Sequence, residues 1–162
     1  DITRIQAGER KFNMEPFDIC EQAREIIISS EQRLEDKKLD VSFEADRDNM
    51  FVNADRGAIH QILSNICDNA IKYSLKQATI RIFITEDDQF FKINVKDTGM
   101  GISREDLPRI FERFYRVDKA RSRAMGGTGL GLSIVKHAAA YHKAEIQLQS
   151  SPGNGTTITI QF

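Results

Sequence analysis

The sequence predicts an α/β fold in which helices pack on one face of a mixed, mostly antiparallel sheet, a two-layer α/β sandwich. Apolar residues recur at every second position in some segments and at every third or fourth position in others, as strands and helices require. Most predicted strands are joined by short polar turns, which favours antiparallel pairing. With 162 residues, of which 40% are hydrophobic, the chain is long enough for one domain with a substantial core.

The predicted elements follow one another without repeats or low-complexity stretches. Asp18 and Asp55 stand where helix N-caps are needed, and Asp97 closes a strand. Residues 98–127 contain no clean strand pattern. In chain order we expect a helix end at 1–10, a strand at 11–17 closed by Pro16, a helix at 18–35, strands at 39–45 and 50–52, a helix at 56–74, a hairpin of strands 78–85 and 90–96, a helix at 129–142, and a hairpin of strands 145–150 and 156–162.

Composition excludes several classes of protein. The net charge is −1, so no overall field attracts nucleic acid or a membrane surface, and no apolar run approaches the ~20 residues of a membrane span. Cys20 and Cys67 lie in apolar helical patterns without C-x-x-C spacing, so we expect reduced core residues and a reducing, cytoplasmic setting. His60, His137 and His142 have no paired ligands in the sequence, and we expect packed or solvated rings.

The predicted helix at 56–74 carries an unusual polar stripe. Asn65, Asn69 and Tyr73 recur every four residues and share one face, with Lys72 beside them. A neighbouring apolar row of the same period consists of Ile62, Ile66 and Ala70. Asn is a weak helix former that costs a few tenths of a kcal/mol in mid-helix, so a ligand is expected to compensate. We interpret this ligand as a nucleotide with bound magnesium.

A second candidate segment, Asp97-Thr98-Gly99-Met100-Gly101-Ile102, follows a predicted strand. Two glycines two positions apart allow a flat ligand to approach the backbone, or allow positive φ. The carboxylate can accept a hydrogen bond from an exocyclic amine, and Met100 and Ile102 can wall an apolar slot. The alternative is a tight turn with a capping Asp, because such turns are common.

The third candidate segment, Gly126-Gly127-Thr128-Gly129-Leu130-Gly131-Leu132, opens a predicted helix. Free N–H groups at a helix start, with glycines that allow close approach, form an anion site. The segment is not a Walker A loop, which requires G-x-x-x-x-G-K-[ST]. It is not a dinucleotide fingerprint either, because Leu132 and Ile134 occupy the required third glycine positions. The alternative is a flexible hinge.

Residues 109–123 lie between the glycine segments and hold six basic residues and three aromatics in fifteen positions. Neutral net charge and flanking glycines favour a mobile lid whose arginines reach phosphate oxygens. A nucleic-acid patch and a solvated charged helix are the alternatives.

Together these segments resemble the catalytic ATP-binding domain of sensor histidine kinases, of the PhoR/WalK-like kind, within the gyrase, Hsp90, histidine kinase and MutL superfamily. The resembling motifs are Asn65–Tyr73 (N box), Asp97–Ile102 (G1 box), Phe111–Arg116 (F box), Gly127–Leu132 (G2 box) and Gly153–Ile158 (final G-x-G-T-T segment). The resemblance implies a Bergerat fold with a mobile ATP lid over residues 11–162, preceded at 1–10 by the end of a dimerisation helix.

The resemblance also implies ATP and Mg²⁺ as cofactors. Asn69, helped by Asn65, would ligate Mg²⁺, and Asp97 would accept from adenine N6. The residues implied to bind nucleotide are Asn69, Lys72, Tyr73, Asp97, Gly99, Gly101, Ile102, Arg116, Gly127, Thr128, Gly129, Leu130, Gly131 and Thr157, and those implied in catalysis are Asn65, Asn69, Lys72 and Arg116. Arg113, Arg121 and Arg123 are weaker lid candidates, and Thr157 would support adenine through water.

The implied partners are the protein's own dimerisation domain, which carries the phosphoacceptor histidine, and the receiver domain of a response regulator. The domain would lie on the cytoplasmic side of a membrane-anchored homodimeric sensor, would be monomeric in isolation, and would contact neither nucleic acid nor membrane. No histidine here stands in the H-E-x-R-like acceptor context of the family.

Two departures from the family pattern bear on function. His142-Lys143-Ala144 replaces the usual His-Gly-Gly, so positive φ at Lys143 would cost roughly 1 kcal/mol. Asn65 stands where hydrolytic relatives carry a water-activating Glu, and a carboxamide is not a general base.

The alternatives to a histidine kinase domain are an ATP-hydrolysing gyrase- or Hsp90-like module and a nucleotide-binding regulatory module without transfer activity.

Overall fold

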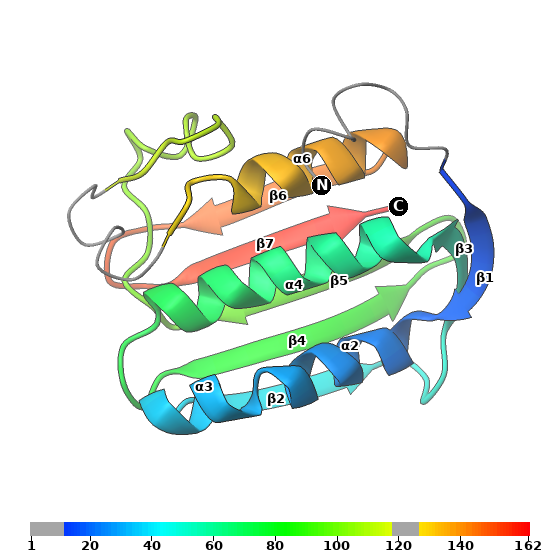
Figure 1. Ribbon diagram of the computed structural model, residues 1–162, viewed down its shortest axis with the longest axis horizontal. Coiled ribbons are helices and arrows are strands. Elements are labelled where there is room, and N and C mark those ends of the chain that lie inside the picture. The colour runs from blue at the N-terminus through cyan, green and yellow to red at the C-terminus, as the bar shows by residue number, and fades with distance from the viewer. Residues whose placement is uncertain (1–11, 118–126) are drawn as a thin grey trace.

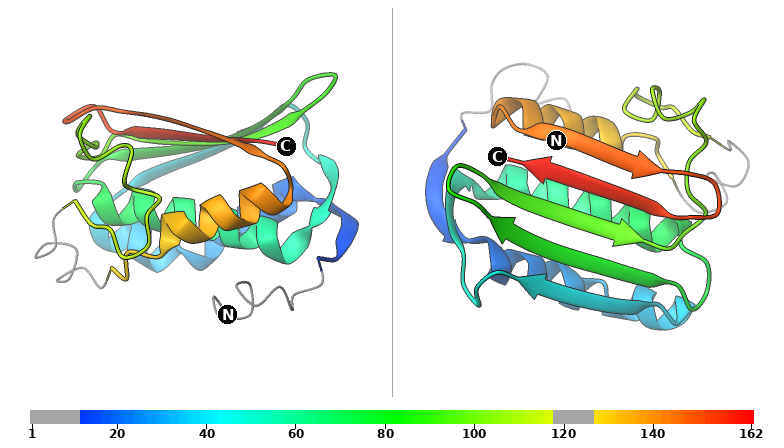
Figure 2. Two further views of the ribbon diagram at one scale, coloured as in Figure 1. Left: turned by 90° about the horizontal axis from the view of Figure 1, so that it is seen from above. Right: turned by 180° about the vertical axis from the view of Figure 1, so that it is seen from behind.

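Four helices lie on one face of a five-stranded sheet in the part of the chain that the computed structural model describes, residues 12–117 and 127–162 (Figure 1, Figure 2). The expected two-layer α/β sandwich is therefore confirmed. The elements are β1 (Met14–Asp18), α2 (Ile19–Ser29), α3 (Glu31–Lys37), β2 (Asp40–Ala45), β3 (Phe51–Asp55), α4 (Arg56–Tyr73), β4 (Thr79–Glu86), β5 (Phe91–Asp97), α6 (Gly131–Tyr141), β6 (Glu145–Ser150) and β7 (Thr156–Gln161).

The large sheet has the strand order β2-β4-β5-β7-β6. Strand β2 pairs in parallel with β4, and the other neighbours are antiparallel, as in the predicted mixed sheet. Figure 2 shows the helices on one side of the sheet and the opposite face without helices. No helix within the described ranges combines the length and apolar composition needed to cross a membrane.

Strand alternation creates the core between the two layers. On the central strands, the residues that face the helices are buried and β-branched, and they pack against the apolar row of α4. These residues are Ile80, Ile82 and Ile84 of β4, Ile93 and Val95 of β5, Ile158 and Ile160 of β7, and Ile59, Ile62, Leu63 and Ile66 of α4. Because side chains alternate along a strand, the residues between them face the other side of the sheet.

The single helix predicted for 18–35 is wrong, because the segment forms two helices that meet at Ser30. The Ser29 hydroxyl donates to the Ile26 carbonyl, and the Ser30 N–H bonds to the Ile27 carbonyl at 3.0 Å. Serine hydroxyls compete with the helical hydrogen bonds, so a Ser-Ser pair weakens the helix here. The predicted cap is confirmed: Asp18 Oδ1 accepts from the Cys20 N–H at 3.0 Å.

The first strands also differ from the prediction. Pro16 lies inside β1 and does not close it, and the strand expected at 50–52 extends to Asp55. Strand β3 pairs with β1 in a separate two-stranded sheet at one end of the molecule (Figure 1). Proline is tolerated there because each strand of a two-stranded sheet is an edge strand.

Helix α4 is fixed at both ends. Asp55 Oδ1 accepts from the Ala58 N–H at 2.8 Å, which confirms the predicted N-cap. At the other end, the Lys37 ammonium donates to three carbonyl groups, those of Ile71 (2.7 Å), Lys72 (2.8 Å) and Ser74 (3.3 Å). The Met100 N–H donates to the Tyr73 carbonyl at 3.3 Å. The final turn of α4 is thereby tied to α3 and to the loop that follows β5.

We predict that Lys37→Met lowers the free energy of unfolding by about 2 kcal/mol, because a partly buried cation leaves the carbonyl end of α4. Urea denaturation of the domain measures this change. Lys76→Met is the matched control, since Lys76 is an exposed lysine three residues after the end of α4. Equal losses in the two variants would contradict the role given to Lys37.

Both cysteines are buried, as expected. Burial raises the pKa of the Cys67 thiol to about 12 and also raises that of Cys20. We predict that neither thiol reacts with a disulfide reagent in the native protein over a time that labels both in denaturant, because the thiolate is the reacting species. Rapid labelling of either cysteine under native conditions would contradict this packing.

Candidate functional site

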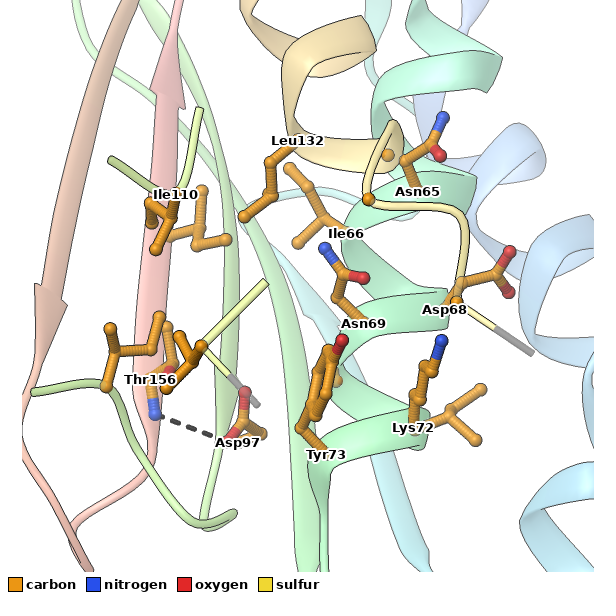
Figure 3. Close-up of a pocket in the computed structure, with 18 of the residues that line it drawn as sticks. Asn65, Ile66, Asp68, Asn69, Lys72, Tyr73, Asp97, Ile110, Leu132 and Thr156 are labelled. Carbon is orange, nitrogen blue, oxygen red and sulfur yellow. Dashed lines mark hydrogen bonds between the residues drawn. The ribbon is translucent and has the colours of Figure 1, made fainter. Parts of the chain in front are cut away.

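A cavity of about 920 Å³ opens beside the C-terminal half of α4 (Figure 3). Its walls come from α3, α4, β5, β7, the loop after β5, residues 110–117 and the glycine segment before α6. All three candidate segments from the sequence therefore border one cavity. The predicted site residues that line it are Asn65, Asn69, Lys72, Tyr73, Asp97, Gly101, Ile102, Arg116, Gly127, Thr128, Gly129, Leu130 and Gly131.

Asp97 is the buried carboxylate at one end of the cavity. Its Oδ1 atom accepts from the Gly99 N–H at 2.8 Å and from the Thr156 N–H at 3.2 Å, while Oδ2 takes part in neither bond. Burial raises the pKa of Asp97, and the two backbone hydrogen bonds oppose this rise. An acceptor is therefore held rigidly in an apolar setting, with Met100, Ile102 and Ile110 among the wall residues.

The two glycines after Asp97 serve the packing of this loop. A Cβ atom at Gly99 would lie 2.8 Å from both Asp97 Oδ1 and the Tyr73 carbonyl oxygen. At Gly101, where φ is +71°, it would lie 1.9 Å from the Ser151 carbonyl oxygen. Gly99 is not among the lining residues, so the expectation that it makes room for a ligand is corrected: it makes room for Asp97 and α4.

The prediction for Thr157 is also corrected. Thr156 and Ile158 line the cavity, and Thr157, between them on β7, faces the opposite side of the sheet. Thr156 reaches the site through its N–H bond to Asp97 and through its hydroxyl, which lies 2.9 Å from that of Ser150. The choice of Thr157 came from the family resemblance, whereas the alternation of the strand, with Ile158 and Ile160 facing the core, places Thr156 on the cavity side.

The polar stripe of α4 enters the cavity as predicted. Figure 3 shows Asn69 and Tyr73 projecting toward the side that holds Asp97, with Lys72 at the same end of the helix. The Asn65 amide donates to the Gln61 carbonyl at 2.7 Å. The Oδ1 atom of Asn65 faces the glycine segment: a Cβ atom added at Gly131 would lie only 3.0 Å from it.

The glycine segment leads directly into α6, an eleven-residue helix whose N-terminus borders the cavity. Leu130 at the N-cap makes no side-chain cap hydrogen bond, so the partial positive charge of the helix start is not offset by a cap. Gly129 has φ +71°, and its carbonyl accepts from the Phe114 N–H at 2.9 Å. This contact joins the glycine segment to the residues that precede 118–126.

The arginines of the predicted lid have different surroundings. Arg116 lines the cavity, whereas the Arg113 guanidinium lies 3.2 Å from His137 Nε2 on α6. Arg121 and Arg123, together with Gly126, lie outside the described residues. Sequence reasoning missed Ile110, Tyr115 and Val117, which line the cavity next to Arg116. The three aromatic residues among positions 109–123 indicated packing in this segment, but the pattern did not show which of its residues would line the cavity.

His142 is a structural connector between α6 and the start of α4. Its Nε2 atom accepts from the Asp55 N–H at 3.1 Å, and its Nδ1 atom bonds to the Ala138 carbonyl at 2.9 Å. The next residue, Lys143, has φ +54°, the positive φ expected for a lysine in the place of a family glycine.

Three residues on the α3 side of the cavity carry charges that sequence reasoning did not connect with the site: Arg33, Asp36 and Lys37. Asp68 of α4 lines the same side, with Arg33 Nη2 at 2.8 Å from Asp68 Oδ1. No local pattern marks these residues, because α3 reaches the cavity only through tertiary packing.

Comparison with known proteins identifies the family. A model of the "Histidine kinase-, DNA gyrase B-, and HSP90-like ATPase" family matches residues 54–162. The chain is 38% identical over its full length to the sensor-like histidine kinase SenX3 of Mycolicibacterium smegmatis, and 39% identical over 98% of its length to the sensor histidine kinase WalK of Bacillus subtilis. It spans only 42% and 26%, respectively, of the lengths of these relatives.

Solved structures agree with this result. The catalytic domain of histidine kinase ThkA superposes with a TM-score of 0.81 at 26% identity, covering 93% of this chain and 95% of that one. Full-length ShkA in complex with AMPPNP superposes with a TM-score of 0.85 at 25% identity, covering 98% of this chain and 33% of that one. On the family match, the cavity and the fold together, the chain belongs to the histidine kinase-, DNA gyrase B- and HSP90-like ATPase family.

Proposed function

We propose that this chain is the ATP-binding catalytic domain of a two-component sensor histidine kinase. It binds Mg-ATP and donates the γ-phosphoryl group to a histidine on a dimerisation domain, from which the group passes to the receiver domain of a response regulator. The observation that carries this proposal is the meeting of three features in one cavity: the carboxamide stripe of α4, the buried Asp97 carboxylate, and the glycine-rich start of α6.

The base of the nucleotide would bind at the Asp97 end. Asp97 Oδ1 is occupied by two backbone donors, so Oδ2 is the oxygen that accepts from the exocyclic amine of adenine. A guanine would present a carbonyl oxygen in the corresponding place and repel the carboxylate. The apolar walls, including Met100 and Ile102, suit a flat ring. The AMPPNP complex of the similar protein ShkA supports an adenine nucleotide.

The phosphates would bind between α4 and the start of α6. Backbone N–H groups of the glycine segment, the uncapped helix terminus, Lys72 and Arg116 together supply donors and positive charge. Catalysis of phosphoryl transfer is mainly a matter of positioning and charge stabilisation, so these groups suffice without a covalent role for the protein. Held in this way, the triphosphate would present its γ-phosphoryl group to the histidine of the dimerisation domain.

The residues present also fit a magnesium ion. Within the described part of the chain, no cluster of three or more His, Cys, Asp or Glu side chains could hold a metal, so a cation here would depend on carboxamide, water and phosphate oxygens. The Asn69 and Asn65 side chains offer such hard oxygen donors at the cavity wall. When bound, the ion would offset the charge of the phosphates during transfer.

The positions and partners of the carboxylates around the cavity favour transfer of the phosphoryl group over hydrolysis of ATP. Among the described lining residues these are Asp36, Asp68 and Asp97. Asp97 lies at the end of the cavity proposed for adenine, Asp68 is paired with Arg33, and Asp36 accepts a hydrogen bond from Gln32 at 3.0 Å. The position from which hydrolytic relatives activate water carries Asn65, which is not a base at neutral pH.

We extend the proposal to the whole protein, which by analogy with the relatives' names is a sensor. We propose that residues 11–162 form the catalytic domain and that the complete protein is a membrane-anchored homodimer with this domain on the cytoplasmic side. Residues 1–10, for which the resemblance implies the end of a dimerisation helix, lie outside the described residues. In isolation the domain would be a monomer.

A two-step experiment tests the function. Calorimetry should detect Mg-ATP binding with a micromolar Kd, roughly −7 to −8 kcal/mol. Addition of the protein's own dimerisation domain and labelled ATP should then produce acid-labile phosphohistidine on that domain. Release of phosphate without protein labelling would identify a hydrolytic module, and binding without either reaction would identify a regulatory one.

We predict that Asp97→Asn weakens Mg-ATP binding at least about tenfold, because a hydrogen bond to a charged partner contributes about 1.5–3 kcal/mol and the new amide would oppose the adenine amine. The folded-state pKa of Asp97 lies above the ordinary 3.8, so its buried charge costs stability at pH 7 and costs none below both pKa values. The variant's Tm at pH 7 should therefore be unchanged or higher.

Calorimetry and thermal unfolding measure the two effects separately. Asp88→Asn, in an exposed turn, is the control for removal of a carboxylate. Unchanged ATP affinity in Asp97→Asn would show that the base binds elsewhere.

We predict that Asn69→Ala weakens ATP binding by about tenfold or more in the presence of Mg²⁺ but changes binding in EDTA little, because the side chain acts through the cation. Calorimetry in the two buffers measures the difference. Asn53→Ala is the control, since Asn53 is exposed on β3 and does not line the cavity. An equal loss with and without metal would refute a magnesium role for Asn69.

A further inference from the structure

An ion pair between α3 and α4 lies at one edge of the cavity. Arg33 Nη2 is 2.8 Å from Asp68 Oδ1, both side chains are about half exposed, and both residues line the cavity. The Arg33 guanidinium also donates to the Ser30 hydroxyl at 2.9 Å, so its position is fixed by two acceptors. An exposed pair of this kind contributes only about 0–1 kcal/mol to stability, so its effect on charge in the cavity is the more important property.

Asp68 lies beside the polar stripe of α4, on the helix face that carries Lys72, which contacts phosphate in the proposed function. It precedes Asn69 and stands four residues before Lys72, on the same helix face. In Figure 3 the Asp68 and Lys72 side chains lie on the same side of α4. A lone carboxylate at this place would repel a polyphosphate.

The other charged groups of α3 at this edge are already engaged. The Lys37 ammonium donates to the carbonyls at the end of α4, and Asp36 accepts from Gln32. Arg33 is thus the α3 cation that is directly paired with Asp68. The charge of this edge depends on whether both members of the pair are present.

We propose that Arg33 preserves the preference of the site for ATP over ADP by neutralising the charge of Asp68, and that Arg33 is thereby a specificity-determining residue. The inference rests on the proposed function. ATP carries one more negative charge than ADP, and that charge lies at the phosphate end. Removing a positive charge from the edge therefore weakens ATP binding more than ADP binding, and removing a negative charge does the opposite.

The size of the effect follows from Coulomb's law. A unit charge near the protein surface, at a distance comparable to the ~10 Å screening length at 0.1 M salt, changes the ATP/ADP affinity ratio by about two- to fivefold. The same change should shrink toward onefold at 0.5 M salt, because screening shortens the range.

The test compares Arg33→Gln, Asp68→Asn and the double variant by calorimetry with Mg-ATP and Mg-ADP at 0.1 and 0.5 M salt. We expect the ATP/ADP affinity ratio to fall about two- to fivefold in Arg33→Gln, to rise by a similar factor in Asp68→Asn, and to return close to the wild-type value in the double variant. The ratio cancels any general loss of folding or binding.

The chain offers a matched control in the Arg81–Glu44 pair, with 2.6 Å between Arg81 Nη2 and Glu44 Oε2 and similar exposure, on strands β4 and β2. Neither residue lines the cavity, so Arg81→Gln should leave the ratio unchanged. A ratio in Arg33→Gln equal to that of Arg81→Gln would overturn the inference. So would a double variant as impaired as Arg33→Gln, because Arg33 would then bind phosphate directly.

Failure of the inference remains distinguishable from failure of the proposed function. Wild-type protein that binds no Mg-ATP would refute the proposed function. Wild-type protein that binds Mg-ATP, with a ratio insensitive to Arg33, would refute only the role of the ion pair.

Discussion

The carbonyl groups at the end of α4 need hydrogen-bond donors from outside the helix, and the site depends on where those donors come from. Lys37 of α3 supplies three bonds, and the Met100 N–H supplies one from the loop after Asp97. A helix end left without partners would cost free energy for each buried carbonyl. The same bonds that satisfy the backbone therefore hold Lys72 and Tyr73 against the loop that follows the buried carboxylate of Asp97.

A second set of bonds connects that loop to the last hairpin. The Ser150 hydroxyl accepts from the Ile102 N–H at 2.8 Å and lies 2.8 Å from the Gly155 carbonyl oxygen, to which it donates. The Gly153 N–H donates to the Met100 carbonyl at 2.8 Å. Segments about fifty residues apart in sequence thus form one wall, which explains why Gly101 and Gly155 have so little space around them.

The local patterns in the sequence predicted much of the fold and the centre of the site. Alternation found the strands because one face of the sheet is buried, and the period of α4 placed Asn69 and Tyr73 on one face. Capping chemistry located Asp18 and Asp55 correctly. These features depend on neighbours within a few residues, so they are visible without tertiary structure.

What the sequence could not predict depends on contacts between distant segments. The break at Ser30 and the pairing of β3 with β1 reflect competition between local and tertiary bonds. The choice of Thr157 in place of Thr156 is different, because it followed the family resemblance although the alternation with Ile158 and Ile160 favours Thr156. Arg33 reaches the cavity only because α3 packs beside α4.

The contact between His142 and Asp55 has a mechanical consequence. It joins the C-terminal end of α6 to the N-terminal end of α4, while the start of α6 meets the middle of α4 at Gly131 and Asn65. The two helices are antiparallel and share a fixed joint at the end away from the cavity. A rotation about this joint would widen the gap between the helices at the other end while the His142–Asp55 contact is kept, so a small angular change at His142 would become a larger displacement beside the cavity.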